Sequence, residues 1–124
     1  MEPKNIVDTI PRGVTLAEYI WIDGSGENVR GKTKVIQGTV SKLEDLDWWT
    51  YDGSSTSQAT TEESEIWLKP VFMCNDPFRE GFGIIVLCEG YLQDRKTPAI
   101  GNFRSIAETV LNEAKDEEPW FGVE

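Results

Sequence analysis

Four consecutive residues, Asp52-Gly53-Ser54-Ser55, offer the clearest chemistry in this sequence. They follow the aromatic run WWTY at residues 48–51, whose side chains bury a large area and can fix the direction of the chain. A carboxylate and two hydroxyls on such a loop could hold a cation or a polar ligand. Asp-Gly is also a common turn signal, so on composition alone the end of a hairpin is the commoner interpretation.

Other candidate groups have simpler explanations. The acidic runs at 62–65 and 116–118 lack the ligand spacing of a calcium loop and are typical of solvated turns. Gly24-Ser25-Gly26 lies between two expected strands and opens no helix, which argues against a phosphate-binding loop. Glu124, the last residue, could be a metal ligand whose partners lie beyond the chain, or only a terminal carboxylate.

Composition excludes several classes of function. The sequence contains no histidine, so it cannot form a Ser-His-Asp or Cys-His site by itself. A net charge of −10 argues against nucleic acid and against anionic membrane surfaces as partners. No signal peptide or membrane-spanning run is present, and we expect a cytoplasmic location. Cys74 and Cys88 are then expected as buried thiols and not as a disulfide.

The elements that must position the loop can be placed from their patterns. A polar lead-in is expected over residues 1–13, and a single domain over 14–124. Strands are expected at 14–22, 28–37, 65–74 and 83–92, the second at an edge and the last at the centre of the sheet. Residues 119–124 also resemble the start of a strand.

Apolar side chains on both faces of the strand at 14–22 predict cover on both sides, with a helix on one. In the strand at 65–74, Ile66, Leu68, Phe72 and Cys74 are expected on one face, and Pro70 predicts a bulge or an edge. Trp67 lies on the opposite face, either exposed as a contact surface or packed under a neighbouring loop.

After Gly101 the apolar period changes to that of a helix, and Asn102 is a good N-cap. We therefore expect an α+β domain, with a β-grasp-like mixed sheet of four to five strands and one amphipathic helix at about 103–115.

Four blocks stand out in the sequence: AEYIWIDG at 17–24, WTYDGSST at 49–56, DPFR at 76–79 and EPWFGVE at 118–124. They resemble eukaryotic-type glutamine synthetases, in the small N-terminal β-grasp domain of that family. They occur in the family's order and at similar spacing, and the resemblance covers residues 14–124. The chain departs from the family at Gly31, at Thr60-Thr61 and at Glu80, which puts the shape of the loop and the subunit contacts in question but leaves Asp52 and Ser55 in place.

The resemblance implies a role in ATP-dependent ligation of ammonium to glutamate. Asp52 would help to bind ammonium and accept its proton, Ser55 would support the loop, and Glu124 would ligate metal only together with a catalytic domain. That large domain, with the ATP and Mg²⁺ or Mn²⁺ sites, is not matched, so we expect no cofactor and no activity for this chain alone. Its partner would be the catalytic domain of its own or a neighbouring subunit.

Two other hypotheses remain open at this stage. The chain could be a stand-alone, non-catalytic interaction module that docks on full-length glutamine synthetase and modulates it. It could also be a generic acidic β-grasp binding domain.

Overall fold

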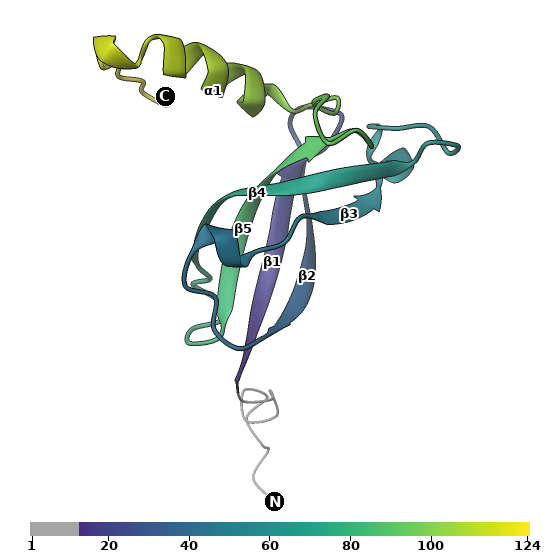
Figure 1. Ribbon diagram of the computed structural model, residues 1–124, viewed down its shortest axis with the longest axis vertical. Helices are drawn as coiled ribbons and strands as arrows, with labels where there is room; N and C mark the ends of the chain where they lie inside the picture. Colours follow the sequence, from purple (N-terminus) through teal and green to yellow (C-terminus); the bar gives the residue numbers. More distant parts are fainter. Residues whose placement is uncertain (1–12) are drawn as a thin grey trace, which may run out of the picture.

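The computed structural model describes residues 13–124, so the expected lead-in lies outside the described residues except for Gly13. Five strands and one α-helix follow in chain order, with short 3₁₀ turns between them (Figure 1). The strands are β1 (Val14–Ile22), β2 (Val29–Gln37), β3 (Trp49–Asp52), β4 (Glu65–Asn75) and β5 (Gly83–Tyr91), and the helix is α1 (Phe103–Glu113). The 3₁₀ turns are η2 (Leu43–Asp45), η3 (Gly53–Thr56) and η4 (Lys115–Glu117).

All five strands form one mixed sheet in the order β2-β1-β5-β4-β3. β1 and β5 pair in parallel at its centre, and the other pairs are antiparallel. The expected edge position of β2 and central position of β5 are confirmed. The architecture is therefore the predicted α+β, β-grasp-like fold.

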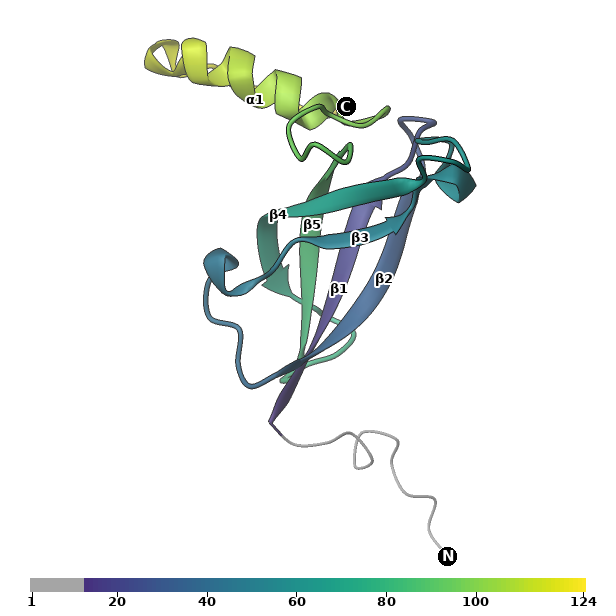
Figure 2. The ribbon, with the colours of Figure 1, turned by 45° about the vertical axis from the view of Figure 1, so that its right-hand side comes forward.

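The core lies on the inner face of a sheet that curls over itself (Figures 1 and 2). Ala17, Tyr19 and Trp21 of β1 are buried there, together with Leu68 and Val86 of the neighbouring strands. The connection between β2 and β3 closes this core, because Leu46 is buried and Leu43 packs against the same cluster.

A bulge in β4 changes which side chains face the core. The register between β4 and β5 shifts between Pro70 and Phe72, as the proline predicted. Beyond the shift, Met73 packs against the core, while Phe72 and Cys74 are exposed. The expected inward orientation of Phe72 and the expected burial of Cys74 are therefore wrong, because one extra residue reverses the alternation of faces. Cys88 is buried as expected.

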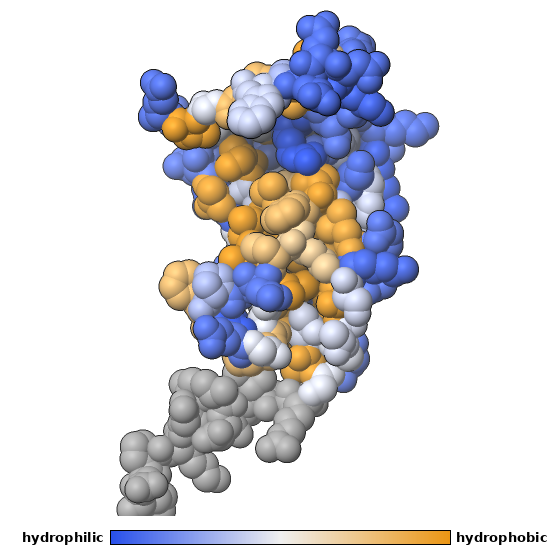
Figure 3. Space-filling view, turned by 90° about the vertical axis from the view of Figure 1, so that its left-hand side faces the viewer, coloured by the Kyte–Doolittle hydropathy of each residue, from blue (hydrophilic) through white to orange (hydrophobic). Residues whose placement is uncertain are grey.

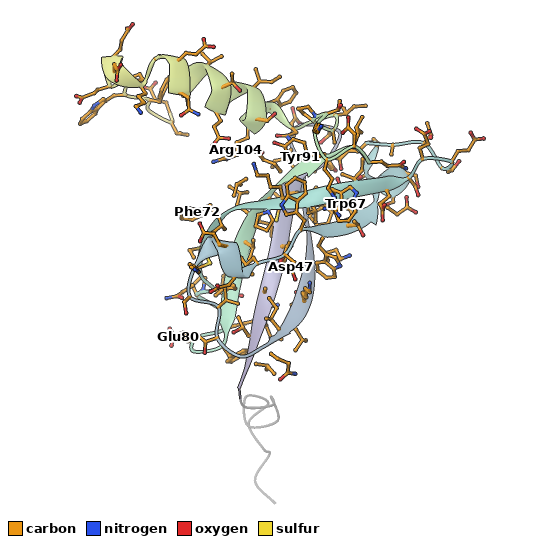
Figure 4. The ribbon with its side chains drawn as sticks, viewed as in Figure 1. Asp47, Trp67, Phe72, Glu80, Tyr91 and Arg104 are labelled. Carbon is orange, nitrogen blue, oxygen red and sulfur yellow. The ribbon has the colours of Figure 1, made fainter. Side chains whose placement is uncertain are left out.

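No helix of residues 13–124 lies over the outer face of the sheet (Figures 1 and 2). Cross-strand pairing places an apolar set on this face, and its members are half-buried or exposed: Leu16, Ile20, Ile22, Val29, Val35, Phe72, Ile85 and Leu87. Figure 3 shows apolar side chains gathered over a broad area below the helix, on the side where Phe72 lies in Figure 4. The expectation that a helix covers one face of β1 is wrong for this chain.

Helix α1 instead leaves the end of β5 and extends away from the sheet (Figures 1 and 2). Asn102 caps it, as predicted, by accepting a hydrogen bond from the Ser105 N–H at 3.3 Å. Its apolar stripe, Phe103, Ile106, Val110 and Leu111, is exposed. The helix ends at Glu113 and continues as η4, slightly earlier than the predicted 115. No described helix is long and apolar enough to cross a membrane.

The C-terminal residues 119–124 form no strand, contrary to expectation. Trp120, Phe121 and Val123 are almost fully exposed. A strand forms only where a neighbouring strand satisfies its backbone groups, and the tail pairs with no edge of the described sheet.

Candidate functional site

The Asp52 loop opens the long connection of a hairpin and is not a tight turn, because β3 and β4 pair antiparallel up to Asp52 and Glu65. β3 finishes at Asp52, η3 follows immediately, and β4 begins only at Glu65. Asp52 caps η3, because its Oδ1 accepts hydrogen bonds from the Ser54 N–H at 3.0 Å and from Ser54 Oγ at 2.6 Å. Ser55 Oγ donates to the Asp52 carbonyl at 3.0 Å. The loop is thus a compact, internally bonded turn on the surface.

The same hydrogen bonds set the charge of Asp52. Those from the Ser54 side chain and backbone hold the pKa of the Asp52 carboxyl below its ordinary value, against a small opposing effect of desolvation. The carboxylate is exposed, and within residues 13–124 it takes part in no salt bridge. At neutral pH it is an anion without a cationic partner, which is the group needed to bind a small cation.

Aromatic side chains form the base of the loop, as the sequence predicted. The Tyr51 ring packs on Trp21 with centroids 4.3 Å apart, and Trp49 meets Tyr19 edge-on at 5.4 Å. Lys32 lies 3.6 Å from the centroid of the Trp49 ring and donates to the Thr50 carbonyl at 2.8 Å. β3 is therefore fixed on both sides just before Asp52.

The loop also packs closely against the β1–β2 turn. The Gly24 N–H donates to the Thr56 carbonyl at 2.8 Å, and a Cβ on Gly24 would lie 2.2 Å from the Ser57 carbonyl oxygen. Only glycine allows this approach. The segment 24–26 thus supports the loop, and no helix follows it to make the phosphate-binding loop that the sequence argued against.

Gln58 is the residue of this region that sequence reasoning missed. It is 2% exposed, and its side chain hydrogen-bonds to Tyr51, Thr56, Ile22 and Ile100. The only sequence signal was its position three residues after Ser55. Nothing in a polar loop sequence indicates which amide side chain will be buried.

The other predicted groups lie elsewhere. Glu124 is exposed at the chain end beneath α1, away from Asp52 (Figure 1). The acidic runs at 62–65 and 116–118 are exposed apart from half-buried Ser64. Among the described residues, no group of three or more acidic or thiol side chains could hold a metal ion. The structure therefore does not bring Asp52 and Glu124 together.

Trp67 is half-buried by a neighbouring loop. The Arg95 guanidinium lies 3.4 Å from its ring centroid and 5.8 Å from that of Trp48. Of the two alternatives for Trp67, packing under a loop is the one observed.

Comparison with known proteins agrees with the four sequence blocks. The chain is 45% identical over 115 residues to mitochondrial glutamine synthetase 1 of Drosophila melanogaster, which covers 92% of the chain and 29% of that protein. It is 47% identical over 113 residues to glutamine synthetase of Tuber borchii, covering 91% of the chain and 31% of that protein. The chain matches the N-terminal part of glutamine synthetases.

A third relative is glutamine synthetase of Saccharomyces cerevisiae, 45% identical over 113 residues, with 91% of the chain and 30% of that protein covered. The chain therefore spans about three tenths of the length of the curated glutamine synthetases that it matches. No family model matches the chain. The similarity confirms the resemblance to this part of glutamine synthetases.

Proposed function

We propose that this chain supplies the ammonium-site loop of a glutamine synthetase, which ligates ammonium to glutamate at the expense of ATP. The observation that carries the proposal is the exposed, unpaired Asp52 carboxylate on its rigid aromatic base. The names of the relatives supply the reaction.

The chemistry of Asp52 follows from its charge. An anionic carboxylate attracts ammonium, and accepting a proton from it leaves the neutral nitrogen that can attack a carbonyl or acyl-phosphate carbon. Ser55 holds the turn by its bond to the Asp52 carbonyl. Ser54 makes both of its bonds to Oδ1, so the other oxygen of Asp52 is available to a ligand.

The rest of the site must come from other residues. Glu124 is the only metal ligand that we assign to this chain, and one carboxylate does not hold Mg²⁺ or Mn²⁺ alone. The divalent metal and ATP therefore require a catalytic domain, in the same subunit or a neighbouring one.

The surface of the chain fits such a partner. The α1 stripe and the outer sheet face leave large apolar side chains exposed, more than an isolated domain usually leaves uncovered. A catalytic domain packed there would cover them. We propose a cytosolic location, as the name of the relative from Pinus sylvestris states for that protein.

Reconstitution tests this function. The chain is mixed with a purified catalytic domain from a relative, and glutamine formation from glutamate, ammonium and ATP is measured. We expect activity only in the mixture, and loss of that activity with Asp52→Asn, which keeps the shape of the side chain and removes its charge. Activity of the chain by itself, or an Asp52→Asn mixture as active as the parent, would contradict the proposal.

A second candidate function uses the same exposed apolar surfaces: docking on full-length glutamine synthetase without joining its chemistry. Light scattering of the chain mixed with a full-length synthetase separates the two. Stable incorporation that alters activity, and that is unaffected by Asp52→Asn, would favour this modulating role.

A further inference from the structure

Gln58 lies where four segments of the chain meet. Its side chain contacts the end of β1 at Ile22, β3 at Tyr51, η3 at Thr56 and the lead into α1 at Ile100. The most distant of these partners, Ile100, lies 42 residues from Gln58 in sequence. No other described hydrogen-bonding side chain joins the Asp52 loop to so many elements.

The amide of Gln58 has a partner for each of its hydrogen-bonding positions. Its Oε1 accepts from the Tyr51 hydroxyl and from Thr56 Oγ1, the latter at 2.7 Å. Its Nε2 donates to the Ile100 carbonyl at 3.0 Å and lies 3.4 Å from the Ile22 carbonyl. A side chain with only acceptors could not satisfy the two carbonyls of this set.

The donor from Tyr51 is stable over the accessible pH range. Burial raises the pKa of Tyr51 far above its ordinary value, so its hydroxyl keeps its proton. Its ring remains packed on Trp21. One side of the Gln58 amide is thus bonded to a residue that the core already immobilises.

The backbone of Gln58 closes the same turn. Its N–H donates to the Gly53 carbonyl at 2.9 Å, and the Ala59 N–H donates to the same oxygen at 3.1 Å. Gln58 therefore bonds to the turn that Asp52 caps through both its side chain and its backbone.

The bond to Ile100 extends this connection to the helix. Gly101 lies against the Asp23 carbonyl, where a Cβ would be 2.2 Å from the oxygen, and Asn102 caps α1. The Asn102 Nδ2 also donates to the Gly90 carbonyl at 2.8 Å. The segment that receives the Gln58 bond is therefore itself held to β5 and to the β1–β2 turn.

We propose that Gln58 is a positioning residue that fixes the Asp52–Ser55 loop relative to the end of β1 and the start of α1. The functional part of this inference rests on the proposed role of Asp52 in binding ammonium. Gln58 acts through the geometry of the loop and not by touching the substrate.

Hydrogen exchange of the full chain, followed by NMR, tests the positioning role. The variants are Gln58→Ala and the milder Tyr51→Phe, which removes one donor but keeps the ring on Trp21. Gln93→Ala removes an exposed glutamine from another loop and is the matched control. The amides of Gly24 and Ala59 report on the loop, and those in the middle of β1 and β5 report on global opening.

We expect the loop amides of Gln58→Ala to exchange about tenfold faster or more, as the loss of buried hydrogen bonds implies. Amides in the middle of β1 and β5 should change by less than about twofold, because local opening leaves global stability unaffected. If Gln58→Ala does not fold, Tyr51→Phe carries the test, with a smaller loop-specific increase. An equal increase at every amide would overturn the inference, because it would mean that Gln58 contributes only to global stability.

A second measurement separates this inference from the proposed function. In the reconstituted enzyme, Gln58→Ala should raise the KM for ammonium while leaving the KM for glutamate unchanged. Loop-specific exchange with an unchanged ammonium KM would confirm the positioning role and contradict the ammonium role of Asp52. Uniform exchange would overturn the positioning role whatever the kinetics show.

Discussion

Arg104 at the start of α1 donates a 2.6 Å hydrogen bond from Nη1 to Oε1 of Glu89, whose side chain is completely buried in β5. The second oxygen of Glu89 accepts from the Tyr91 hydroxyl at 2.7 Å. Arg104 and Tyr91 lie beside each other where the helix meets the sheet (Figure 4). This bond, together with the Asn102 cap, sets the direction in which the helix leaves the sheet.

Removing the Arg104 guanidinium should therefore destabilise the chain. Arg104→Met keeps much of the apolar stem but leaves the buried Glu89 carboxylate with only its Tyr91 bond. Since Arg104 is itself 43% exposed, we expect a loss of about 1–3 kcal/mol in the free energy of unfolding, below the cost for a fully buried pair. Urea unfolding measures it.

The matched control for that change is Glu108→Gln. Glu108 also pairs with Arg104, at 3.7 Å, but it is half-exposed. Its loss should alter stability by less than about 0.5 kcal/mol. Equal effects of the two substitutions would contradict the special role of Glu89.

Gly24→Ala should disturb the Asp52 loop from a distance of more than twenty residues in sequence. The new methyl would overlap the Ser57 carbonyl, and backbone cannot move aside as a flexible side chain can. We expect a loss of about 1–3 kcal/mol or more and shifted NMR signals for Ser54 and Ser55. Gly122→Ala, where a Cβ meets nothing within 4 Å, should have neither effect.

The ionised Asp94 carboxylate should add to the free energy of unfolding, and this contribution should be lost in acid. Hydrogen bonds from the side chain and backbone of Thr97 and from the Lys96 N–H lower the pKa of Asp94 to about 2. A lowered pKa in the folded state means that the stabilisation is complete above about pH 4, the ordinary value for aspartate, and is lost as the pH falls through about 2.

The urea midpoints of Asp94→Asn and the parent chain, compared across this range, check this effect. We expect the parent to be the more stable above about pH 4 and the difference to close towards about pH 2. A difference independent of pH would contradict the assignment of the lowered pKa to Asp94.

The two cysteines should differ in reactivity. Cys74 is exposed, whereas burial raises the pKa of the Cys88 thiol to about 12. Because the thiolate is the reactive form, an aromatic disulfide reagent at neutral pH should modify one thiol in the folded chain and both in denaturant. Cys74→Ser should abolish the fast reaction, and a residual fast reaction would mean that Cys88 is accessible.

The α1 stripe should be needed for partner binding but not for folding. Val110 is 57% exposed, so Val110→Glu should change the free energy of unfolding of the chain by less than about 0.5 kcal/mol. It should nevertheless abolish association with the catalytic domain, measured by light scattering. Asn112→Glu, which adds the same charge beside the stripe, is the control and should still associate.

Local patterns predicted four of the five strands, the edge position of β2 and the Asn102 cap. They did not predict the short strand β3, and they suggested a strand at 119–124 that does not form. The orientation of Phe72 was wrong because Pro70 indicated a bulge but not that the extra residue would enter the pairing with β5 just before Phe72. The buried hydrogen bonds of Gln58 were missed because its partners, Ile22 and Ile100, come close to it only in the folded chain.

For helix α1 the local structure was predicted but its packing was not. Its apolar period was predicted correctly, but the period does not say what the stripe packs against, and no described element of this chain covers it. Asp52 was singled out by residue type together with the order of four sequence blocks. That an aspartate in such a turn bonds nearby backbone N–H groups follows from its residue type, but that Ser54 supplies both the N–H and the hydroxyl is seen only in the folded chain.

The parallel pairing of β1 with β5 has a consequence for biosynthesis. β1 begins at residue 14 and its central partner only at residue 83, so the ribosome adds this partner roughly 3 to 14 s later at ordinary elongation rates. During that interval β1 can pair only with β2, and its other edge stays unpaired. We therefore expect the nascent chain to depend on chaperones until β5 emerges, and the sheet to close in a single late step.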